Sequence, residues 1–361
     1  MSAGNDFSAD LYRHYSASLR KGVDSVDFES FPVSDQLRAN VSRFAAYKAH
    51  HVSGKLRDIL TDDQIAAKDR NNQAKALLKK FDRWHDAEYS TTVARSRTAK
   101  QFSEFMQPDS MRLFPNLRWL PSRSVDLRVE HTAFYNRVWP KDDPFWQSNS
   151  PGTLWNCKCD VEETDDGTTN NKDVREIKPP AGLEGNPAFT GEVFTDRASY
   201  IAKNKPFRVP GDEFKNLNTL VNNNTKKWRV DYYTDNEGIL QTSRKRIKES
   251  ELNKQELEKF EKEHTMSLTL AKNGHRIVYR ETIQGSFDIF MNDRPAELKK
   301  TKSHNHIVDY AKKAIREQGA EMVVFEFGKM TPEIYQELNK LGKLGIEAKY
   351  FVTNENKVYN L

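Results

Sequence analysis

The stretch that shapes the first half of the chain is HTAFYNRVWPKDDPFWQSNSPGTLWNCKCDVEE, which covers His131–Glu163. It holds three of the chain's six tryptophans and both of its cysteines. Prolines and acidic residues interrupt it, and its apolar residues do not recur at helical spacing. The stretch predicts an irregular, aromatic-rich loop and raises the question of why both cysteines lie within it.

Cys157 and Cys159 are separated by a single residue. A disulfide across so short a separation is strained, and two cysteines in 361 residues cannot form a disulfide framework. With His131 in the same stretch, two thiolates and an imidazole make a donor set suited to Zn²⁺. The alternative is that both cysteines are small buried apolar residues. Candidates for a fourth ligand are Asp126 and Asp160.

Length and composition limit the classes of protein. A chain of 361 residues predicts two or three domains, and 37% hydrophobic with 30% charged residues predicts modest cores. No apolar run approaches the ~18 residues of a membrane span, and the N-terminal residues lack the apolar segment of a signal peptide. We therefore expect a cytoplasmic protein without a membrane span. A net charge of +5 permits a polyanionic partner without requiring one.

The residues before the loop predict helices. No glycine or proline lies between Lys55 and Gln107, and the segment is rich in residues that favour helix. A second helical stretch begins near Asp62, after a cap-like TDDQ. We expect a long antiparallel helical scaffold. Apolar residues at helical spacings in its first part are Leu37, Val41, Phe44, Val52, Leu56 and Ile59.

The composition changes after the loop. Residues 166–205 are rich in Gly, Pro, Asn, Asp and Thr, which predicts a linker. Strand and helix patterns then alternate over 206–361, which predicts an α/β domain with its core at about 252–361. The predicted fold class is multidomain α plus α/β, with a mostly helical domain over 1–165 that carries the irregular cysteine- and tryptophan-rich loop.

A second group of functional residues lies in GSFDIFMNDRPAELKKTKSHN. Asp288 falls on one strand candidate, and Glu297 and Lys299 fall on the next, where residues two apart share a face. A short hairpin through NDRP would place Asp288 beside them. Paired carboxylates suit Mg²⁺ or Mn²⁺, which can activate water toward a phosphodiester, while the lysine stabilises developing charge. The alternative is a chance set of solvated charges.

This D-x8-E-x-K pattern is the minimal signature of the PD-(D/E)xK nucleases, which have the restriction-endonuclease-like fold. The predicted order of helix, three strands, helix and strand is the core order of that fold. Residues 252–361 also resemble the tRNA-nuclease toxin domains of contact-dependent inhibition systems, through LAKNGH, the D…ExK strands and EQGAEMVV. Phe287 stands where a proline is common.

The nuclease resemblance implies a hydrolase that cleaves RNA, with tRNA favoured, or DNA, and it implies an immunity protein as a partner. Glu263 matches an extra metal-binding glutamate of some members, and its alternative is a solvated helix charge. His304 is a candidate general acid, and its alternative is a polar first turn of a helix. The basic segments TKKWRV, SRKRIK and ELKKTK suit a phosphate backbone, although such runs also occur as solvated faces.

Residues 60–165 resemble the Mu F-like, SPP1-type minor head (head morphogenesis) proteins of tailed phages. The resemblance implies a minor capsid protein near the portal, with portal and other head proteins as partners. It places the chain in the host cytoplasm during assembly and then in the virion head, and it implies no active site. The tryptophans would be packing anchors. The matching residues are Ala94, Arg95, Arg128, His131, Trp139, Pro151, Asn156, Cys157 and Cys159.

The sequence as a whole predicts a phage or prophage head protein fused to a metal-dependent endonuclease. One alternative is a purely structural, portal-proximal head protein with a non-catalytic C-terminal domain. Another is a delivered toxin. The enzyme hypothesis requires Asp288, Glu297 and Lys299 to meet at a concave surface, whereas the structural hypothesis requires nothing of them.

Overall fold

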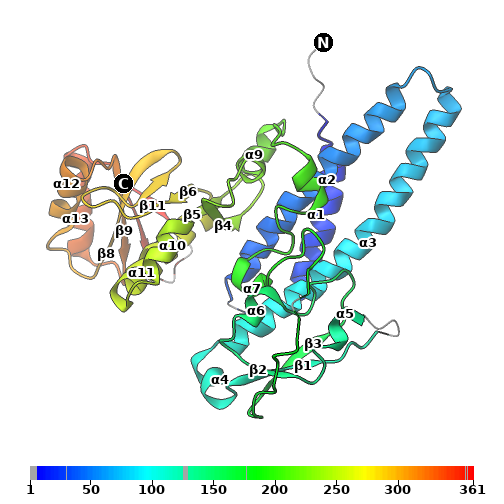
Figure 1. The fold of residues 1–361 in the computed structure, drawn as a ribbon. Helices are drawn as coiled ribbons and strands as arrows, with labels where there is room; N and C mark the ends of the chain where they lie inside the picture. The colour runs from blue at the N-terminus through cyan, green and yellow to red at the C-terminus, as the bar shows by residue number, and fades with distance from the viewer. Residues whose placement is uncertain (1–5, 30, 125–128, 176, 354, 356) are drawn as a thin grey trace. The chain divides into compact units, whose positions relative to one another are not determined.

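A computed structural model describes residues 6–29, 31–124, 129–175, 177–353, 355 and 357–361. The chain divides into two compact units, residues 1–210 and 211–361 (Figure 1). Unit 1 is built on helices and unit 2 on a mixed sheet with helices, in agreement with the predicted α plus α/β class. Among the described helices, none is both long and apolar enough to cross a membrane.

Three helices form the scaffold of unit 1: α1 (Ala9–Asp24), α2 (Val33–Thr61) and α3 (Ala67–Phe105). All three pack against one another, and a short turn joins α2 to α3 (Figure 1). The apolar positions that predicted helix, including Leu37, Val41 and Phe44, are buried on α2. The scaffold therefore follows the helical periodicity of the sequence.

The aromatic loop folds against the end of α3. Its described elements are α5 (Val129–Thr132), β2 (Val138–Pro140), α6 (Phe145–Ser148) and β3 (Asp160–Thr164), which follow α4 (Pro108–Leu113) and β1 (Asn116–Leu120). β1 pairs antiparallel with both β2 and β3, giving the order β2-β1-β3. The stretch therefore contains a small sheet that the sequence analysis did not predict, because its strands are too short to show an alternating pattern.

An aromatic cluster joins this sheet to the scaffold. Trp119, Trp139 and Trp146 are buried and pack with Phe102 and Phe105 of α3. The Trp139 ring stacks on Phe145 at a centroid distance of 4.1 Å. Two of the loop's tryptophans thus serve as packing anchors, as the resemblance implied.

Residues 166–205, expected to form a linker, are part of unit 1. They include α7 (Pro187–Thr190) and α8 (Ser199–Lys203), which pack on α3 and α2. Phe194 is buried and stacks on Phe44 at 4.0 Å, and the Asn40 side chain accepts hydrogen bonds from the backbone N–H groups of Val193 and Phe194. Side chains of the scaffold form hydrogen bonds with the backbone of this segment. The segment can therefore pack against the scaffold although it has few apolar residues.

Arg95 of the VARS element provides a second attachment for the same segment. Its side chain is fully buried, and its guanidinium donates hydrogen bonds to the carbonyls of Leu183 (2.9 Å), Gly185 (3.0 Å) and Glu192 (3.2 Å). Burial lowers the pKa of Arg95 to about 10. An arginine with several donors in a fixed fork can hold several carbonyls at once, so Arg95 fastens 183–192 to α3.

Unit 2 is an eight-stranded mixed sheet in the order β11-β10-β9-β8-β7-β6-β5-β4. Parallel pairs are β5–β6, β8–β9 and β9–β10, and the remaining neighbours are antiparallel. The strands are β4 (Trp228–Tyr233), β5 (Ile239–Ser243), β6 (Arg276–Tyr279), β7 (Ile289–Met291), β8 (Arg294–Thr301), β9 (Met322–Phe327), β10 (Ala348–Val352) and β11 (Tyr359–Asn360).

Helices cover both faces of this sheet. Val324 packs in the cluster that contains α11 residues, while Val323 and Phe325 pack in the cluster that contains α12 and α13 residues. Alternate residues of a strand point to opposite faces, so β9 is buried on both sides. The helices are α9 (Lys215–Val221, after the 3₁₀ turn Asp212–Phe214), α10 (Arg244–Ser250), α11 (Lys254–Lys272), α12 (Ile307–Glu317) and α13 (Pro332–Lys343).

The β7–β8 hairpin sets the register of the predicted acidic group. Met291 pairs with Arg294, and the two residues between them, Asn292 and Asp293, have positive φ angles of 52° and 70°. A two-residue turn with both residues at positive φ is typical of tight hairpins. The same register places Ile289 opposite Ala296, so Asp288 lies one step beyond, level with Glu297.

Candidate functional sites

Unit 2 contains a cavity of about 350 Å³ that gathers the predicted acidic residues, here called the acidic pocket. Glu263 comes from α11, Asp288 from the residue before β7, and Glu297 and Lys299 from β8. Residues separated by up to 36 positions in the sequence thus meet at one concavity. The remaining polar lining residues are Arg246, Lys259, Tyr279, Arg280, Glu281, Thr282, Gln284, Ser286 and Gln318.

Hydrogen bonds fix two of the carboxylates. Asp288 Oδ2 accepts the backbone N–H of Leu298 at 3.0 Å, across the hairpin. Glu297 Oε1 accepts from Lys299 Nζ and, at 3.0 Å, from Gln318 Nε2. Glu297 is only 2% exposed, and its Oε2 has no hydrogen-bond donor among the described residues. The pocket therefore holds a buried carboxylate oxygen that the described side chains leave unsatisfied.

The carboxylates of the acidic pocket disfavour one another's ionised forms. Burial, reinforced by the neighbouring Asp288 carboxylate, raises the pKa of Glu297 to about 7, although Lys299 opposes the shift. Burial and Asp288 likewise raise the pKa of Glu263. Carboxylates that lie close enough to raise one another's pKa can be stabilised in their ionised forms by a hard divalent cation.

Arg246 and Tyr279 hold Glu263, and sequence reasoning missed both residues. The Tyr279 hydroxyl donates to Glu263 Oε2 at 2.7 Å, and Arg246 Nε donates to the same hydroxyl at 3.0 Å. Arg246 is 1% exposed. It belongs to the basic segment SRKRIK, whose charges suggested a solvated face. Only the apolar Ile247 beside it hinted that this helix has a buried side.

His304 is not among the residues that line the acidic pocket. Strand β8 ends at Thr301, and His304 lies beyond it in the turn before α12. It lies near Glu333, at the start of α13. The sequence placed His304 near Lys299, but the strand carries the chain away from the acidic pocket before the histidine is reached.

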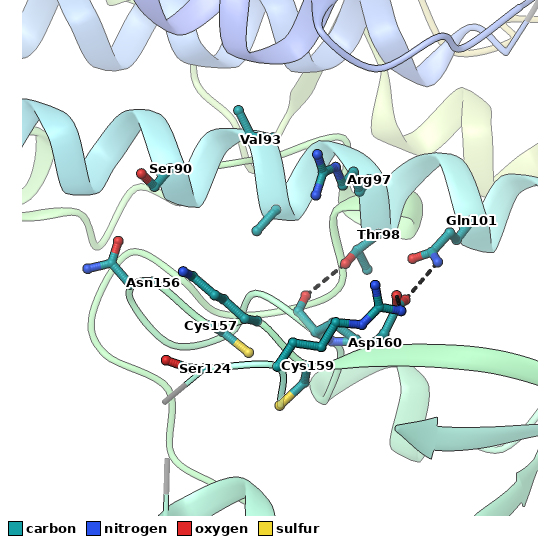
Figure 2. Close-up of a pocket in the computed structure, with 14 residues that line it drawn as sticks. Ser90, Val93, Arg97, Thr98, Gln101, Ser124, Asn156, Cys157, Cys159 and Asp160 are labelled. Atoms are coloured by element: carbon teal, nitrogen blue, oxygen red, sulfur yellow. Dashed lines mark hydrogen bonds and ion pairs between the residues drawn. The ribbon is translucent and has the colours of Figure 1, made fainter. Parts of the chain in front are cut away.

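The second site, here called the cysteine site, contains His131, Cys157 and Cys159 in unit 1. One donor atom from each lies within 4.8 Å of the others. His131 Nδ1 is 3.3 Å from Cys159 Sγ and 3.4 Å from Cys157 Sγ, and both cysteines are free. Figure 2 shows the two sulfur atoms turned to the same side of the loop, away from α3.

Local structure explains why these three side chains meet. His131 lies on the short helix α5, while Asn156, at a positive φ of 57°, turns the chain just before Cys157. Cys159 then leads directly into β3. The edge of the Trp119 ring contacts His131 at a centroid distance of 5.2 Å. A turn and a strand start therefore place both thiols opposite the histidine.

The two thiols have different proton affinities. Hydrogen bonding with Cys159 and the adjacent His131 imidazole lower the pKa of Cys157 to about 4. The same interaction with Cys157, together with burial, raises the pKa of Cys159. The neighbouring thiol and the imidazole thus favour ionisation of Cys157.

A cavity of about 630 Å³ lies between the cysteines and α3 (Figure 2). On its wall, Asp160 Oδ1 accepts a hydrogen bond from Gln101 Nε2 at 2.8 Å, and Oδ2 lies 3.5 Å from Arg123 NH2. Asp160, a candidate fourth ligand, is engaged with these groups and is not part of the cysteine site. Asp126 and Arg128 lie outside the described residues.

Comparison with known proteins gives two partial similarities. The "Putative capsid assembly protein F" of Escherichia phage Mu is 29% identical over 73 residues, which are 20% of this chain and 16% of that protein. The "Mu-like prophage FluMu F protein" of Haemophilus influenzae is 25% identical over 77 residues, 21% of this chain and 19% of that protein. The chain thus matches less than a fifth of each relative's length.

No family model matches the chain, and no solved structure is significantly similar to it. The two partial similarities support a Mu F-like head protein. They carry no information about the acidic pocket, whose interpretation rests on its geometry.

Proposed function

We propose that the protein is a phage or prophage minor head protein whose second unit is a metal-dependent nuclease. The partial similarity to a capsid assembly protein supports the first half of this proposal. A portal-proximal place in the virion head, with portal and other head proteins as partners, follows from the Mu F-like resemblance. The helical scaffold and its aromatic loop would then provide the structural contacts within the head.

One observation carries the nuclease proposal: Glu263, Asp288, Glu297 and Lys299 line one cavity. If the D-x8-E-x-K pattern were a coincidence, its residues would be expected at separate places on the solvated surface of the sheet. The element order α11, β6, β7, β8, α12, β9 is also that of the restriction-endonuclease-like core. The convergence and the order together favour a built site over a coincidence of charge.

The chemistry follows from the positions of the donors. Asp288 and Glu297 would hold Mg²⁺ or Mn²⁺, which supplies Lewis-acid activation of water and of the phosphodiester. Lys299 now donates to Glu297. Once a cation shares that carboxylate's charge, the ammonium is available to a phosphate oxygen. Glu263, held by Tyr279, would provide a further oxygen donor in the acidic pocket.

Basic groups near the acidic pocket favour a polyanionic substrate. Lys259 and Arg280 line the pocket, and Lys245 and Lys227 lie close enough to Glu281 to help lower its pKa. These cations offset the negative carboxylates for an approaching phosphate backbone. RNA, with tRNA favoured, or DNA is the proposed substrate, and an immunity protein would restrain the activity before delivery.

A structural role for unit 2 is the competing proposal, and one observation favours it. Glu297 Oε1 already has two internal donors, Lys299 and Gln318. A pocket that served only the fold would show the same two contacts. It would bind no divalent cation and cleave no nucleic acid.

The test is a cleavage assay with full-length protein in Mg²⁺ or Mn²⁺, against tRNA, other RNA, and single- and double-stranded DNA. We expect at least one substrate to be cut, EDTA to stop the reaction, and Glu297→Gln to abolish it. Glu326→Gln is a matched control, because Glu326 is equally buried on the next strand and does not line the acidic pocket. Four intact substrates, or equal cleavage by Glu297→Gln and wild type, would exclude the nuclease.

A further inference from the structure

We infer that His131, Cys157 and Cys159 bind one Zn²⁺ ion that fixes the aromatic loop in its folded form. The inference concerns unit 1 alone and does not depend on the nuclease proposal. It rests on three independent features of the cysteine site: the spacing of its donor atoms, the polar groups around the sulfurs, and the position of the ligands in the loop.

The spacing is close to that of a zinc site. Zn–S bonds of ~2.3 Å and Zn–N bonds of ~2.0 Å place tetrahedral ligands about 3.5–3.8 Å apart. The nitrogen–sulfur distances here are 3.3 and 3.4 Å, and all three donor atoms lie within 4.8 Å of one another. A shift of a few tenths of an ångström would admit the ion. Few side chains need to move, because the backbone already presents the ligands.

The surroundings favour thiolate sulfur. The Trp119 indole N–H and the Tyr135 hydroxyl are buried, and neither has a hydrogen-bond partner in the part of the chain that the structure describes. Both groups lie close enough to Cys159 to donate to its sulfur. A neutral thiol is a weak acceptor, whereas a metal-bound thiolate accepts such donors well. A zinc-bound thiolate at Cys159 would therefore be a better acceptor for both donors than a thiol.

The ligands close the loop at its two ends. His131 precedes β2 and α6, and the cysteines follow them. Only three residue pairs connect β1 with β2, so the sheet alone constrains the intervening chain weakly. A bound ion would link α5 to the start of β3 and reduce the freedom of the segment that carries Trp139 and Trp146. The loop also rests on α3 through Thr98, whose hydroxyl donates to the Pro151 carbonyl at 2.9 Å (Figure 2).

Three protein donors leave one tetrahedral position of the ion. Asp160, the nearest described carboxylate in sequence, is held by Gln101 and Arg123. The ion's role would be structural, because its protein ligands join α5 to the start of β3.

Elemental analysis tests the inference on full-length protein purified without chelator. We expect one zinc per chain that survives desalting, and loss of more than half of it in Cys157→Ser and in Cys159→Ser. Glu326→Gln, which changes a buried glutamate of unit 2 outside the acidic pocket, should keep the full zinc content. Wild-type protein without zinc, or zinc lost on simple desalting as an adventitious ion only, would overturn the inference.

Cobalt substitution keeps the test informative if a cysteine variant fails to fold. Wild-type protein loaded with Co²⁺ should show thiolate-to-cobalt charge-transfer absorption, and His131→Ala should change the visible bands while retaining some thiolate absorption. Bound zinc should also slow the reaction of both cysteines with a thiol reagent. Absence of the charge-transfer band in folded wild-type protein would contradict the site whatever the variants do.

Discussion

Two pairs of a buried glutamate and a partly exposed lysine lie on neighbouring strands of unit 2, and they differ in what surrounds them. Glu297 pairs with Lys299 within β8, whereas Glu326 of β9 pairs with Lys300 of β8 at 2.7 Å. Each glutamate is 2% exposed. The pairs use different faces of the sheet, because Lys299 and Lys300 are consecutive on one strand.

The difference between the pairs is the number of additional carboxylates. Glu326 has the Thr353 hydroxyl at 2.8 Å as its other described partner, which leaves a charge-balanced pair. Glu297 shares its cavity with the carboxylates of Asp288 and Glu263, and Asp288 helps to raise its pKa. A buried ion pair alone is therefore weak evidence for a functional site. Crowded carboxylates around such a pair are stronger evidence.

The largest expected effect is a loss of nucleic-acid cleavage when Glu297, but not Glu326, is replaced. Glu297→Gln should lower the rate of nucleic-acid cleavage by about 10²–10³-fold or more, since it removes a ligand of the activating cation. Glu326→Gln should cleave at the wild-type rate and lose at most about 1 kcal/mol of unfolding free energy, because water can replace the charged partner of the partly exposed Lys300. Cleavage rates and thermal unfolding of the two variants check this. Equal loss of activity in both would mean that the acidic pocket has no special role.

Removal of zinc should lower the thermal stability of unit 1 and leave that of unit 2 unchanged. If zinc is present at about 1,000 times its Kd, its removal costs about 4 kcal/mol of the free energy of unfolding. Only the thermal transition of unit 1 should move, because the cysteine site lies wholly within it. Calorimetry with and without a zinc chelator resolves the two transitions. A shift of the unit 2 transition alone would contradict the assignment.

Arg95→Lys should weaken the attachment of residues 183–192. Lysine cannot reproduce the fork that donates to the carbonyls of Leu183, Gly185 and Glu192. We expect unit 1 to lose about 2–3 kcal/mol of unfolding free energy, since buried acceptors lose their donors. Limited proteolysis should then cut within 183–192 faster than in wild type. Unchanged protection would show that packing of Phe194 and α8 suffices.

The smallest expected effect is a pH dependence of cation stabilisation. The pKa of Glu297 is raised to about 7 in the folded protein, so the folded state favours its protonated form. That contribution to stability is present below the usual glutamate pKa and is lost as pH rises through about 7. Mn²⁺ should therefore stabilise unit 2 by about 1–2 kcal/mol more at pH 8 than at pH 5.5. In Glu297→Gln this difference should shrink, as thermal shifts at the two pH values will show.

Local rules account for what the sequence could predict. The NDRP turn and the alternation of side chains along a strand are short-range, so the convergence of Asp288, Glu297 and Lys299 could be predicted. Helical periodicity likewise predicted the scaffold. His304 does not line the acidic pocket, because its position depends on where β8 ends, and the sequence does not mark that end.

The unpredicted features depend on distant contacts. Arg246, Tyr279 and Gln318 reach the acidic pocket from three separate elements, and a basic run gives no sign that one of its arginines is buried. Residues 166–205 resemble a linker because their backbone is satisfied by side chains such as Asn40 and Arg95, far away in sequence. The cysteine site was suggested by residue type alone, and only the fold brings His131 to both sulfurs.

The most direct test of the account is Mn²⁺ binding to full-length protein, measured by calorimetry for wild type, Glu297→Gln and Glu326→Gln. We predict that wild type and Glu326→Gln bind Mn²⁺ with the same affinity in unit 2. Glu297→Gln should bind Mn²⁺ about 10–100-fold more weakly. Loss of a residue that only hydrogen-bonds to a metal ligand already has an effect of this size. Indistinguishable affinities for all three proteins, or no Mn²⁺ binding to wild type, would contradict a cation site in the acidic pocket.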